Sequence, residues 1–219
     1  MSIQKFASSF VSKINFLQRS FGKKDFRLLD IGAGNHSATK IKSVFPGCEY
    51  HGVDMEKSYN NSEEDLNAMH TFYQLDLTKL NFSSIPDRYF DGIWMVHVIE
   101  HLFNGDKVIE QLIPKLKPGG FLYVEYPGKK STKLPSMYGT LNFYDDPTHV
   151  RIYSIKELHK LFSANHCELL KSGTRRNMAF ILAMPFRIIY SLIKGRKIQG
   201  NIFWDVTGFA EYLWVKKNN

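Results

Sequence analysis

RLLDIGAGNHS, residues 27–37, joins a short apolar run to a turn that carries two glycines. The run over residues 27–31 is typical of a buried strand that stops at Gly32. Glycine at positions 32 and 34 lets the backbone turn tightly and approach a bound molecule, because no Cβ stands in the way. The pattern of residues 37–44 indicates a short helix, so the stretch predicts a strand, a glycine turn and a helix in succession.

Strands and helices are expected to alternate beyond this unit. Apolar runs that predict further strands lie at residues 50–54, 71–77, 90–96 and 121–126. Helical patterns occupy residues 108–116 and 154–164, with a loose helix within 58–67. A sixth strand at 168–172 and a last strand at 209–216 are expected near the end. Such alternation is typical of parallel βαβ units and predicts a doubly wound α/β sheet.

Acidic residues stand at, or just beyond, four of the predicted strand ends: Asp30, Asp54, Asp76 and Glu100. Right-handed crossovers place the carboxyl ends of parallel strands at one edge, where such sheets bind ligands. Asp54 follows the glycine turn at a spacing that lets a carboxylate accept hydrogen bonds from both ribose hydroxyls. Asp76 can accept a hydrogen bond from an adenine amine or cap a turn. A GxG turn is weak evidence by itself, but with Asp54 it indicates an adenosine site.

Five motifs occur in order between residues 27 and 127: LLDIGAGNHS, YHGVDMEKS, QLDL, FDGIWMVHVIEHL and LKPGGFLYVEYP. In this order and spacing they resemble the motif series of class I S-adenosylmethionine-dependent methyltransferases. The resemblance implies an α/β fold with a doubly wound, mostly parallel seven-stranded sheet, helices on both faces and a C-terminal antiparallel strand. It also implies S-adenosyl-L-methionine as the cofactor and methyl transfer as the reaction.

The resemblance assigns the cofactor to a defined set of residues: Asp30, Gly32, Ala33, Gly34, Asp54, Met55, Asp76, Leu77, Val96 and His97. The glycine turn would pass under the methionine part, and Asp30 would position the amino group. Asp54 would hold the ribose, with Met55 against the adenine. Asn35 and His36 stand where the family often has a third glycine, which leaves the path of the loop open.

The segment HVIEH, residues 97–101, carries two catalytic candidates, Glu100 and His101. An inverted zinc-protease motif shares this pattern but needs a continuous helix, whereas here an apolar strand runs into it. Some methyltransferases hold a divalent ion with the equivalent Glu and His. His97 stands where those enzymes have another carboxylate, so a metal stays open as an alternative and none is assigned. A further interpretation is that Glu100 and His101 tie the loop to its neighbours.

The segment DDPTHVRIYS, residues 145–154, resembles an acceptor-pocket segment of a bacterial subset of the family. Because a histidine can take the proton that an acceptor hydroxyl loses, His149 is the first candidate for a general base or substrate-orienting residue. The alternative is a loop histidine bonded to the backbone. Tyr144 and Arg151 are weaker candidates for acceptor contact. The long loop over residues 128–144 carries three lysines, which suits a lid over an acidic acceptor.

An apolar stretch at residues 178–193 has basic residues at both ends. It is shorter than a bilayer span and is interrupted by Pro185 and Arg187, so a spanning helix is not expected. Two interpretations remain: residues 176–197 lie in a membrane interface, or they form a lid or a homodimer face. The ending WDVTGFAEYLWVKK resembles the same bacterial subset, which is associated with cell-surface glycan synthesis. That resemblance implies a small or lipid-linked glycan as the acceptor.

The chain of 219 residues, 43% of them hydrophobic, suits a single domain. We divide it into an N-terminal helix (1–24, with Phe6 and Phe10 at helical spacing), a cofactor-binding core (25–127), an acceptor-side segment (128–172), an apolar and basic insertion (173–205) and a last strand (206–219). Two distant cysteines and the absence of an apolar leader favour the cytoplasm, at the inner face of the membrane if the insertion binds lipid.

The net charge of +8 is dispersed along the chain, which argues against nucleic acid as a partner. The expected function is O-methylation of a glycan or another small acceptor. An RNA methyltransferase and a non-catalytic scaffold with the same fold are the alternatives. Intact Gly32, Gly34 and Asp54 argue against the scaffold.

Overall fold

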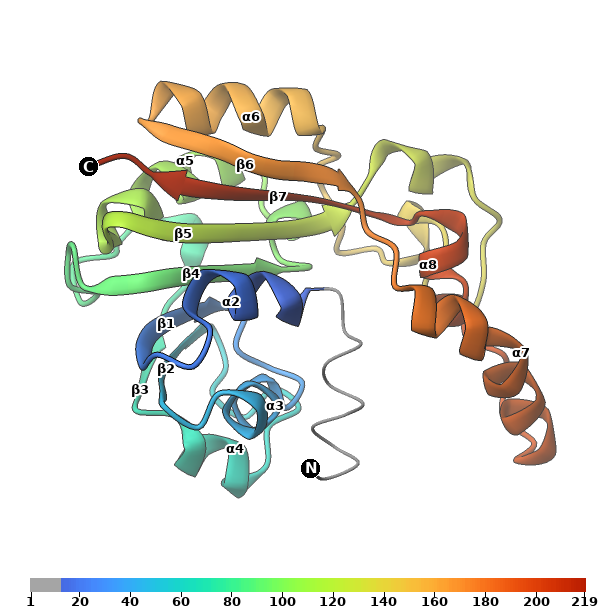
Figure 1. The fold of residues 1–219 in the computed structure, drawn as a ribbon. Coiled ribbons are helices and arrows are strands. Elements are labelled where there is room, and N and C mark those ends of the chain that lie inside the picture. Colours follow the sequence, from blue (N-terminus) through green and yellow to red (C-terminus); the bar gives the residue numbers. More distant parts are fainter. Residues whose placement is uncertain (1–12) are drawn as a thin grey trace.

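The computed structural model describes residues 13–219, which form a seven-stranded sheet with helices on both faces (Figure 1). The strands are β1 (Phe26–Ile31), β2 (Cys48–Asp54), β3 (Thr71–Gln74), β4 (Phe90–Val96), β5 (Leu116–Pro127), β6 (Cys167–Thr174) and β7 (Ala210–Lys217). Their order across the sheet is β3-β2-β1-β4-β5-β7-β6. The first five strands pair in parallel, and β7 runs antiparallel to β5 and β6. The expected doubly wound, mostly parallel α/β fold is confirmed.

The helices connect and cover these strands. They are α2 (Ile14–Phe21), α3 (Ser37–Val44), α4 (Glu63–Ala68), α5 (Gly105–Leu112), α6 (Ile155–Ala164), α7 (Met178–Ile193) and α8 (Trp204–Thr207). Short 3-10 turns include η1 (Leu77–Lys79), η2 (Ile99–His101), η3 (Ile113–Lys115), η4 (Lys129–Lys133), η5 (Phe143–Asp145) and η6 (Gly200–Ile202). Ser154 caps α6, because its side-chain oxygen accepts the N–H of Glu157.

Two apolar cores lie on opposite faces of the sheet, and β1 contributes to both. Leu29 belongs to a core completed by Val108 of α5 and Leu158 of α6. Leu28 belongs to the other core, with Phe16 of α2. Successive strand residues point to opposite faces. A continuous apolar run is therefore what a strand covered on both faces requires.

Two predicted strand boundaries differ from the structure by three residues or more. The third strand, predicted over residues 71–77, ends at Gln74. The chain turns into η1 there, because the side chain of Asp76 accepts the N–H of Thr78. The fifth strand begins at Leu116 instead of residue 121, because the chain already pairs with β4 at Leu116 and resumes regular pairing at Phe121 after an irregularity.

The N-terminal helix, expected over residues 1–24, is represented by α2 in the described part of the chain. α2 buries Phe16 and Leu17 against the sheet. Phe6 and Phe10, on which part of the expectation depends, lie outside the described residues.

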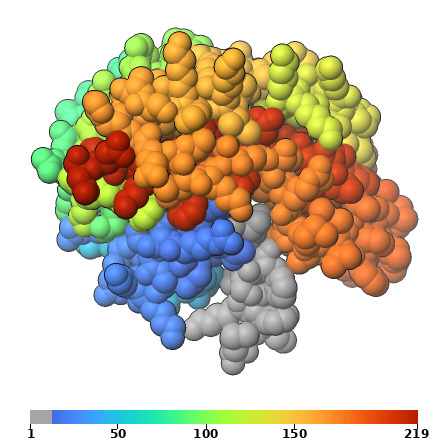
Figure 2. Space-filling view, turned by 45° about the horizontal axis from the view of Figure 1, so that its top comes forward, coloured from blue at the N-terminus to red at the C-terminus, as the bar shows by residue number. Residues whose placement is uncertain are grey.

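Helix α7 lies in the insertion expected over residues 173–205 and differs from every other long helix. Its 16 residues include none that is buried. It projects from the body of the molecule (Figures 1 and 2). Within residues 13–219, no helix combines the length and apolar character needed to cross a membrane.

Candidate functional site

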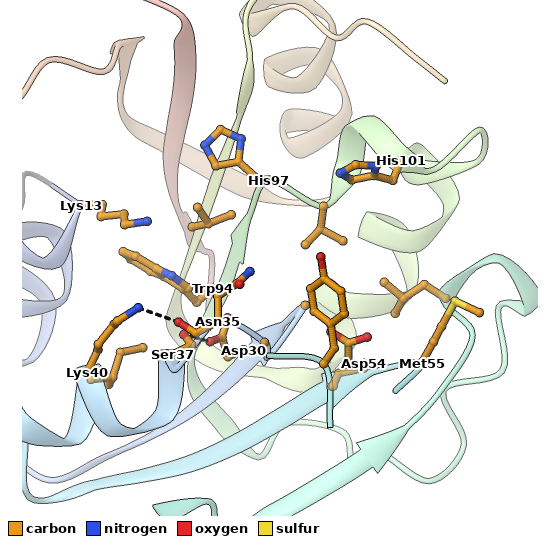
Figure 3. A pocket seen from close by; sticks show the side chains of 18 of the residues that line it. Lys13, Asp30, Asn35, Ser37, Lys40, Asp54, Met55, Trp94, His97 and His101 are labelled. Carbon is orange, nitrogen blue, oxygen red and sulfur yellow. Dashed lines mark hydrogen bonds between the residues drawn. The ribbon is translucent and has the colours of Figure 1, made fainter. Parts of the chain in front are cut away.

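A cavity of about 1260 Å³ opens at the carboxyl edge of the sheet, beyond the ends of β1, β2 and β4 (Figure 3). Nearly all the residues expected to contact the cofactor line it: Asp30, Gly32, Gly34, Asp54, Met55, Asp76, Leu77, Val96 and His97. His101 of η2 lines the same cavity. Ligand pockets commonly reach roughly 1,000 Å³, so this cavity has room for a nucleoside and part of an acceptor.

The glycine turn has a shape that only glycine fits. Gly32 has a φ of +78°, and a Cβ there would stand 2.4 Å from Cγ2 of Val98. A Cβ on Gly34 would stand 2.7 Å from the ring of Tyr59. Asn35, which follows the glycines, adopts a left-handed backbone with a φ of 57°, and His36 does the same. Asn and His tolerate this region better than most residues, so the loop follows a glycine-like path without the third glycine.

Ala33 is the expected cofactor residue that does not line the cavity. Its side chain is fully buried, and a Cβ placed on Gly52 would stand only 2.8 Å from it. Its N–H donates to the carbonyl of Val53 (3.1 Å), and its carbonyl accepts from the side-chain amide of Asn61 (2.8 Å). Ala33 therefore holds the turn against β2, and its contact with the cofactor stays a prediction.

Asp30 ends the apolar run of β1 as a buried acid in the cavity wall (Figure 3). Ser37 and Tyr50 both donate hydrogen bonds to its Oδ2 atom. Burial raises the pKa of Asp30 to about 7, because desolvation of the carboxylate outweighs these two hydrogen bonds. Within the described part of the chain no group donates to Oδ1, so this oxygen remains for a ligand N–H.

Asp54 and Asp76 reach the cavity from neighbouring strands. Oδ1 of Asp54 accepts the N–H of Glu56 at 3.3 Å. Oδ1 of Asp76 accepts the N–H (3.0 Å) and the hydroxyl (2.6 Å) of Thr78. These hydrogen bonds lower the pKa of Asp76. These two hydrogen bonds form the turn cap that was the alternative to ligand binding for Asp76. Asp76 thus caps η1 while it also lines the cavity.

His97 stands between two buried carboxylates. Its Nδ1 lies 3.2 Å from Oε1 of Glu100, and its Nε2 lies 3.4 Å from Oε1 of Glu125. Burial lowers the pKa of His97, but the hydrogen bonds and negative charges of Glu100 and Glu125 outweigh it and raise the pKa. Glu125 also lies 3.2 Å from Nε of Arg175. The two carboxylates thus hold the ring of His97 in place at the wall of the cavity.

Glu100, His101 and His149 come together beside the cavity although they are far apart in the sequence. The N–H groups of Val150 and Arg151 both donate to the carbonyl of Glu100, at 2.9 and 3.2 Å. The ring centroids of His101 and His149 lie 4.8 Å apart. The backbone of η2 therefore holds the predicted acceptor-side segment in place.

His149 has a side chain that is only 5% exposed, and it does not line the cavity. Its Nδ1 lies 2.7 Å from the carbonyl oxygen of Phe143, which is the backbone-bonded arrangement considered as its alternative role. Its Nε2 lies 4.0 Å from Oε1 of Glu100 and 3.8 Å from Oδ2 of Asp146. Among the three catalytic candidates, His101 is the one that reaches the cavity.

The weaker acceptor candidates lie away from the cavity. Tyr144 is 68% exposed. Arg151 forms ion pairs with Asp106 (3.0 Å) and Glu157 (2.7 Å), which give it a structural role. Residues 128–144 contribute no side chain to the cavity wall, so their role as a lid stays a prediction.

Sequence reasoning missed several residues of the cavity wall. Lys13 precedes α2, Trp94 lies within the apolar run of β4, and Phe180 belongs to α7. An apolar strand run carries no signal that one of its members faces a ligand. Phe180 brings the otherwise separate α7 to the edge of the cavity.

The comparisons with known proteins agree with this geometry. Residues 4–172 match the model of a family described as a methyltransferase domain. A Bacillus subtilis protein described as the uncharacterized methyltransferase YcgJ is 31% identical over 150 residues, which are 65% of this chain and 57% of that protein. The aligned part is thus less than two thirds of the relative's length.

Solved structures share the fold. Phosphoethanolamine N-methyltransferase 2 of Haemonchus contortus, in complex with S-adenosyl-L-methionine, has a TM-score of 0.65 at 19% identity, over 94% of this chain and 52% of that one. The [4+2]-cyclase SpnF has a TM-score of 0.60 at 20% identity, over 98% of this chain and 81% of that one. Fold likeness at this level of identity does not decide which reaction takes place.

Fold and cavity together define an α/β protein of the class I, S-adenosylmethionine-dependent methyltransferase type. The family match covers more than half of the chain, so this chain belongs to the methyltransferase domain family.

Proposed function

We propose that this protein transfers the methyl group of S-adenosyl-L-methionine to an oxygen of a small or lipid-linked glycan. One observation carries the proposal: a single cavity is lined by the adenosine set, by polar His101 and Thr148, and by Phe180 of α7. A lipid-linked sugar needs a polar site next to the cofactor and an apolar edge beside it. The cavity offers both environments.

The cofactor would lie with its ribose on Asp54 and its adenine against Met55. Met55 is 63% exposed, so an adenine ring could cover it without displacing core residues. Oδ1 of Asp30 would accept a hydrogen bond from the ammonium group, and the positive charge would favour the ionised carboxylate. Gly32 and Gly34 would let the main chain pass close to the methionine part.

The acceptor hydroxyl would be aligned by the polar end of the cavity. Methyl transfer from a sulfonium is an in-line displacement, so the protein must align the acceptor and exclude water. The O–H bond breaks, the oxygen bonds to the methyl carbon, and the carbon–sulfur bond breaks to release S-adenosylhomocysteine. His101 is placed to orient the hydroxyl or receive its proton. Glu100 and His149 would support His101 from behind the cavity wall.

Helix α7 would place the protein at the cytoplasmic face of a membrane. Apolar side chains stand in solvent along it, among them Leu182 (71% exposed), Phe186 (73%) and Ile193 (77%). The basic residues within and just after it are Arg187, Lys194, Arg196 and Lys197. An apolar surface beside positive charge suits the interface of an anionic bilayer. A homodimer through the same helix is the competing arrangement.

Vesicle flotation with the full chain tests the membrane contact. We expect binding to anionic vesicles and weaker binding to neutral ones. A protein that stays unbound in both cases would contradict the membrane role. A concentration-dependent dimer in analytical ultracentrifugation would then assign α7 to the homodimer.

Calorimetry and acceptor assays test the reaction. We expect S-adenosylhomocysteine to bind, and methyl transfer from labelled S-adenosyl-L-methionine to lipid-linked glycans to depend on Asp54. Failure of the wild type to bind S-adenosylhomocysteine would indicate the non-catalytic scaffold. Transfer to RNA but not to glycans would indicate the RNA methyltransferase.

A further inference from the structure

The cluster of Glu100, His101 and His149 has the spacing of a metal site. One ligand atom from each of the three side chains lies within 4.8 Å of the others. Bonds of about 2.0–2.2 Å to a divalent ion place neighbouring ligand atoms roughly 3–3.6 Å apart. A small contraction of the side chains would therefore bring all three to bonding distance.

Both imidazoles are held in the tautomer that a metal ligand requires. Nδ1 of His149 lies 2.7 Å from the carbonyl oxygen of Phe143, and Nδ1 of His101 lies 3.2 Å from that of Thr148. The hydroxyl of Thr148 lies 2.8 Å from Nδ1 of His101 and donates its own proton to Asp146, so it accepts from the ring as the carbonyls do. These partners favour the tautomer in which each Nδ1 carries the proton and each Nε2 keeps its lone pair. Metal-bound histidines commonly fix their second nitrogen through such an outer hydrogen bond.

Glu100 holds a buried carboxylate with one oxygen that has no hydrogen-bond partner among the described residues. Its side chain is 1% exposed, and its Oε2 atom has no hydrogen-bond partner within residues 13–219. None of the lysines or arginines described in the structure lies within 4.0 Å of it. Its ion-pair contact with His97 is shared with Glu125. An incompletely paired carboxylate is costly to bury, and a bound cation would remove this cost.

A second cluster, Glu49, His51 and His70, provides the contrast. Its ligand atoms also lie within 4.8 Å of one another. There, however, the carboxylate has a cation, because Nε of Arg27 lies 3.3 Å from Oε1 of Glu49. The hydroxyl of Tyr89 also donates to that oxygen, at 3.0 Å. Glu49 is therefore paired with an arginine, whereas Glu100 has only the shared imidazole of His97 and an Oε2 atom without a partner among the described residues.

We propose that Glu100, His101 and His149 bind a divalent first-row transition-metal ion. Oδ2 of Asp146 lies 3.8 Å from Nε2 of His149 and would complete the site directly or through water. Two imidazoles and a carboxylate favour Mn²⁺, Fe²⁺, Co²⁺ or Zn²⁺ over Mg²⁺ or Ca²⁺, which prefer oxygen ligands. In the sequence, position 97 lacks the carboxylate that would serve as the third ligand. In the structure, His149 supplies a third ligand from a distant loop.

The ion would face the acceptor end of the cavity, because His101 and Asp146 line its wall. With three or four protein ligands, coordination positions would remain for an oxygen of the acceptor. With its Nε2 bound to the ion, His101 would not take the acceptor proton itself; the ion would lower the pKa of the acceptor hydroxyl and the proton would pass to water. This role toward the acceptor rests on the proposed function, whereas the binding of the ion does not.

Titration of the tag-free full-length protein with Co²⁺, after removal of metal by chelation and without cofactor, tests the site. We expect one saturable Co²⁺ per chain, seen in visible absorption, and Mn²⁺ binding in calorimetry. Glu100→Gln and His149→Gln should each weaken the affinity on the order of 100-fold, the upper range for disturbing a metal site. His70→Gln, in the contrasting cluster, should leave it unchanged.

Binding of S-adenosylhomocysteine to the same variants separates this site from the cofactor site. Retained heat of binding shows that a variant is folded and that the adenosine site is intact. A wild type without saturable Co²⁺ binding up to millimolar concentration would overturn the proposal. So would unchanged affinity in a folded Glu100→Gln or His149→Gln variant, or loss of binding in His70→Gln.

Discussion

The cofactor core and helix α7 use apolar residues in opposite ways. In β1, Leu28 and Leu29 are fully buried on opposite faces of the sheet. In α7 no residue is buried, and Leu182 is 71% exposed. Apolar composition alone therefore does not place a segment in the core, because burial also requires neighbours on the correct face. The exposed face of α7 is available to an environment less polar than water.

The largest difference is expected between two leucine truncations, one in each region. Leu29→Ala should lower the free energy of unfolding by about 2–5 kcal/mol, because it leaves a cavity in the core. Leu182→Ala should change it by less than about 0.5 kcal/mol, because its side chain stands in solvent. Denaturant unfolding of both variants measures the contrast. Similar losses would mean that α7 is packed against protein.

The next effect concerns the ligand side of the core. Asp54→Ala should weaken S-adenosylhomocysteine binding roughly 100-fold, or about 3 kcal/mol, because two hydrogen bonds from the ribose to a carboxylate are lost. Calorimetry measures this change, and Glu56→Ala is the matched acidic control outside the cavity wall. Affinity that survives Asp54→Ala would remove the basis of the adenosine site.

A smaller effect is expected at the basic end of the insertion. Replacing Arg196 and Lys197 by glutamine should weaken binding to anionic vesicles roughly 30-fold, because each charge contributes about 1 kcal/mol near such a surface. Replacing Lys23 and Lys24, an exposed basic pair in the core region, serves as the control. Equal losses for both pairs would show general charge attraction without a specific role for the insertion.

The smallest effect is a pH dependence that arises in the core. The pKa of Asp30 is raised to about 7 by burial, and the ligand ammonium needs the ionised form. Affinity for S-adenosylhomocysteine should therefore rise about tenfold from pH 6 to pH 8. Asp30→Asn should bind weakly at every pH, and a wild-type affinity that falls with rising pH would contradict the assignment.

Asp30 should also make the stability of the cofactor-free protein depend on pH. Because the pKa of Asp30 in the folded state exceeds the ordinary aspartate value of 3.8, the folded protein holds the proton more tightly than the unfolded chain. The contribution of Asp30 to stability is thus present at low pH and lost as the pH rises from about 4 to about 7. Thermal unfolding of wild type and Asp30→Asn across this range measures it.

Local patterns predicted much of the fold. α3 occupies residues 37–44 as predicted, because a glycine turn precedes it and Pro46 and Gly47 follow it. α6 lies at the expected place because Ser154 caps it. The overlong third strand shows the limit, since an alternating pattern continued past the point where Asp76 turns the chain.

The residues of the site likewise fall into those that the sequence could identify and those that it could not. The glycine turn and Asp54 could be recognised because each carries a motif within a few residues. The burial of Ala33 under the turn could not be recognised. Nor could the approach of His149 to Glu100, which follows from hydrogen bonds between the acceptor-side segment and the backbone of η2.

By itself the sequence determined the class of fold and the acids that meet at the sheet edge, because periodicity and glycine turns act over a few residues. Only the tertiary structure decided that Asp30 is buried enough to titrate near neutrality, that among the described residues Oε2 of Glu100 has no hydrogen-bond partner, and that α7 is uncovered. Each of these depends on burial, and burial depends on which distant segments pack together.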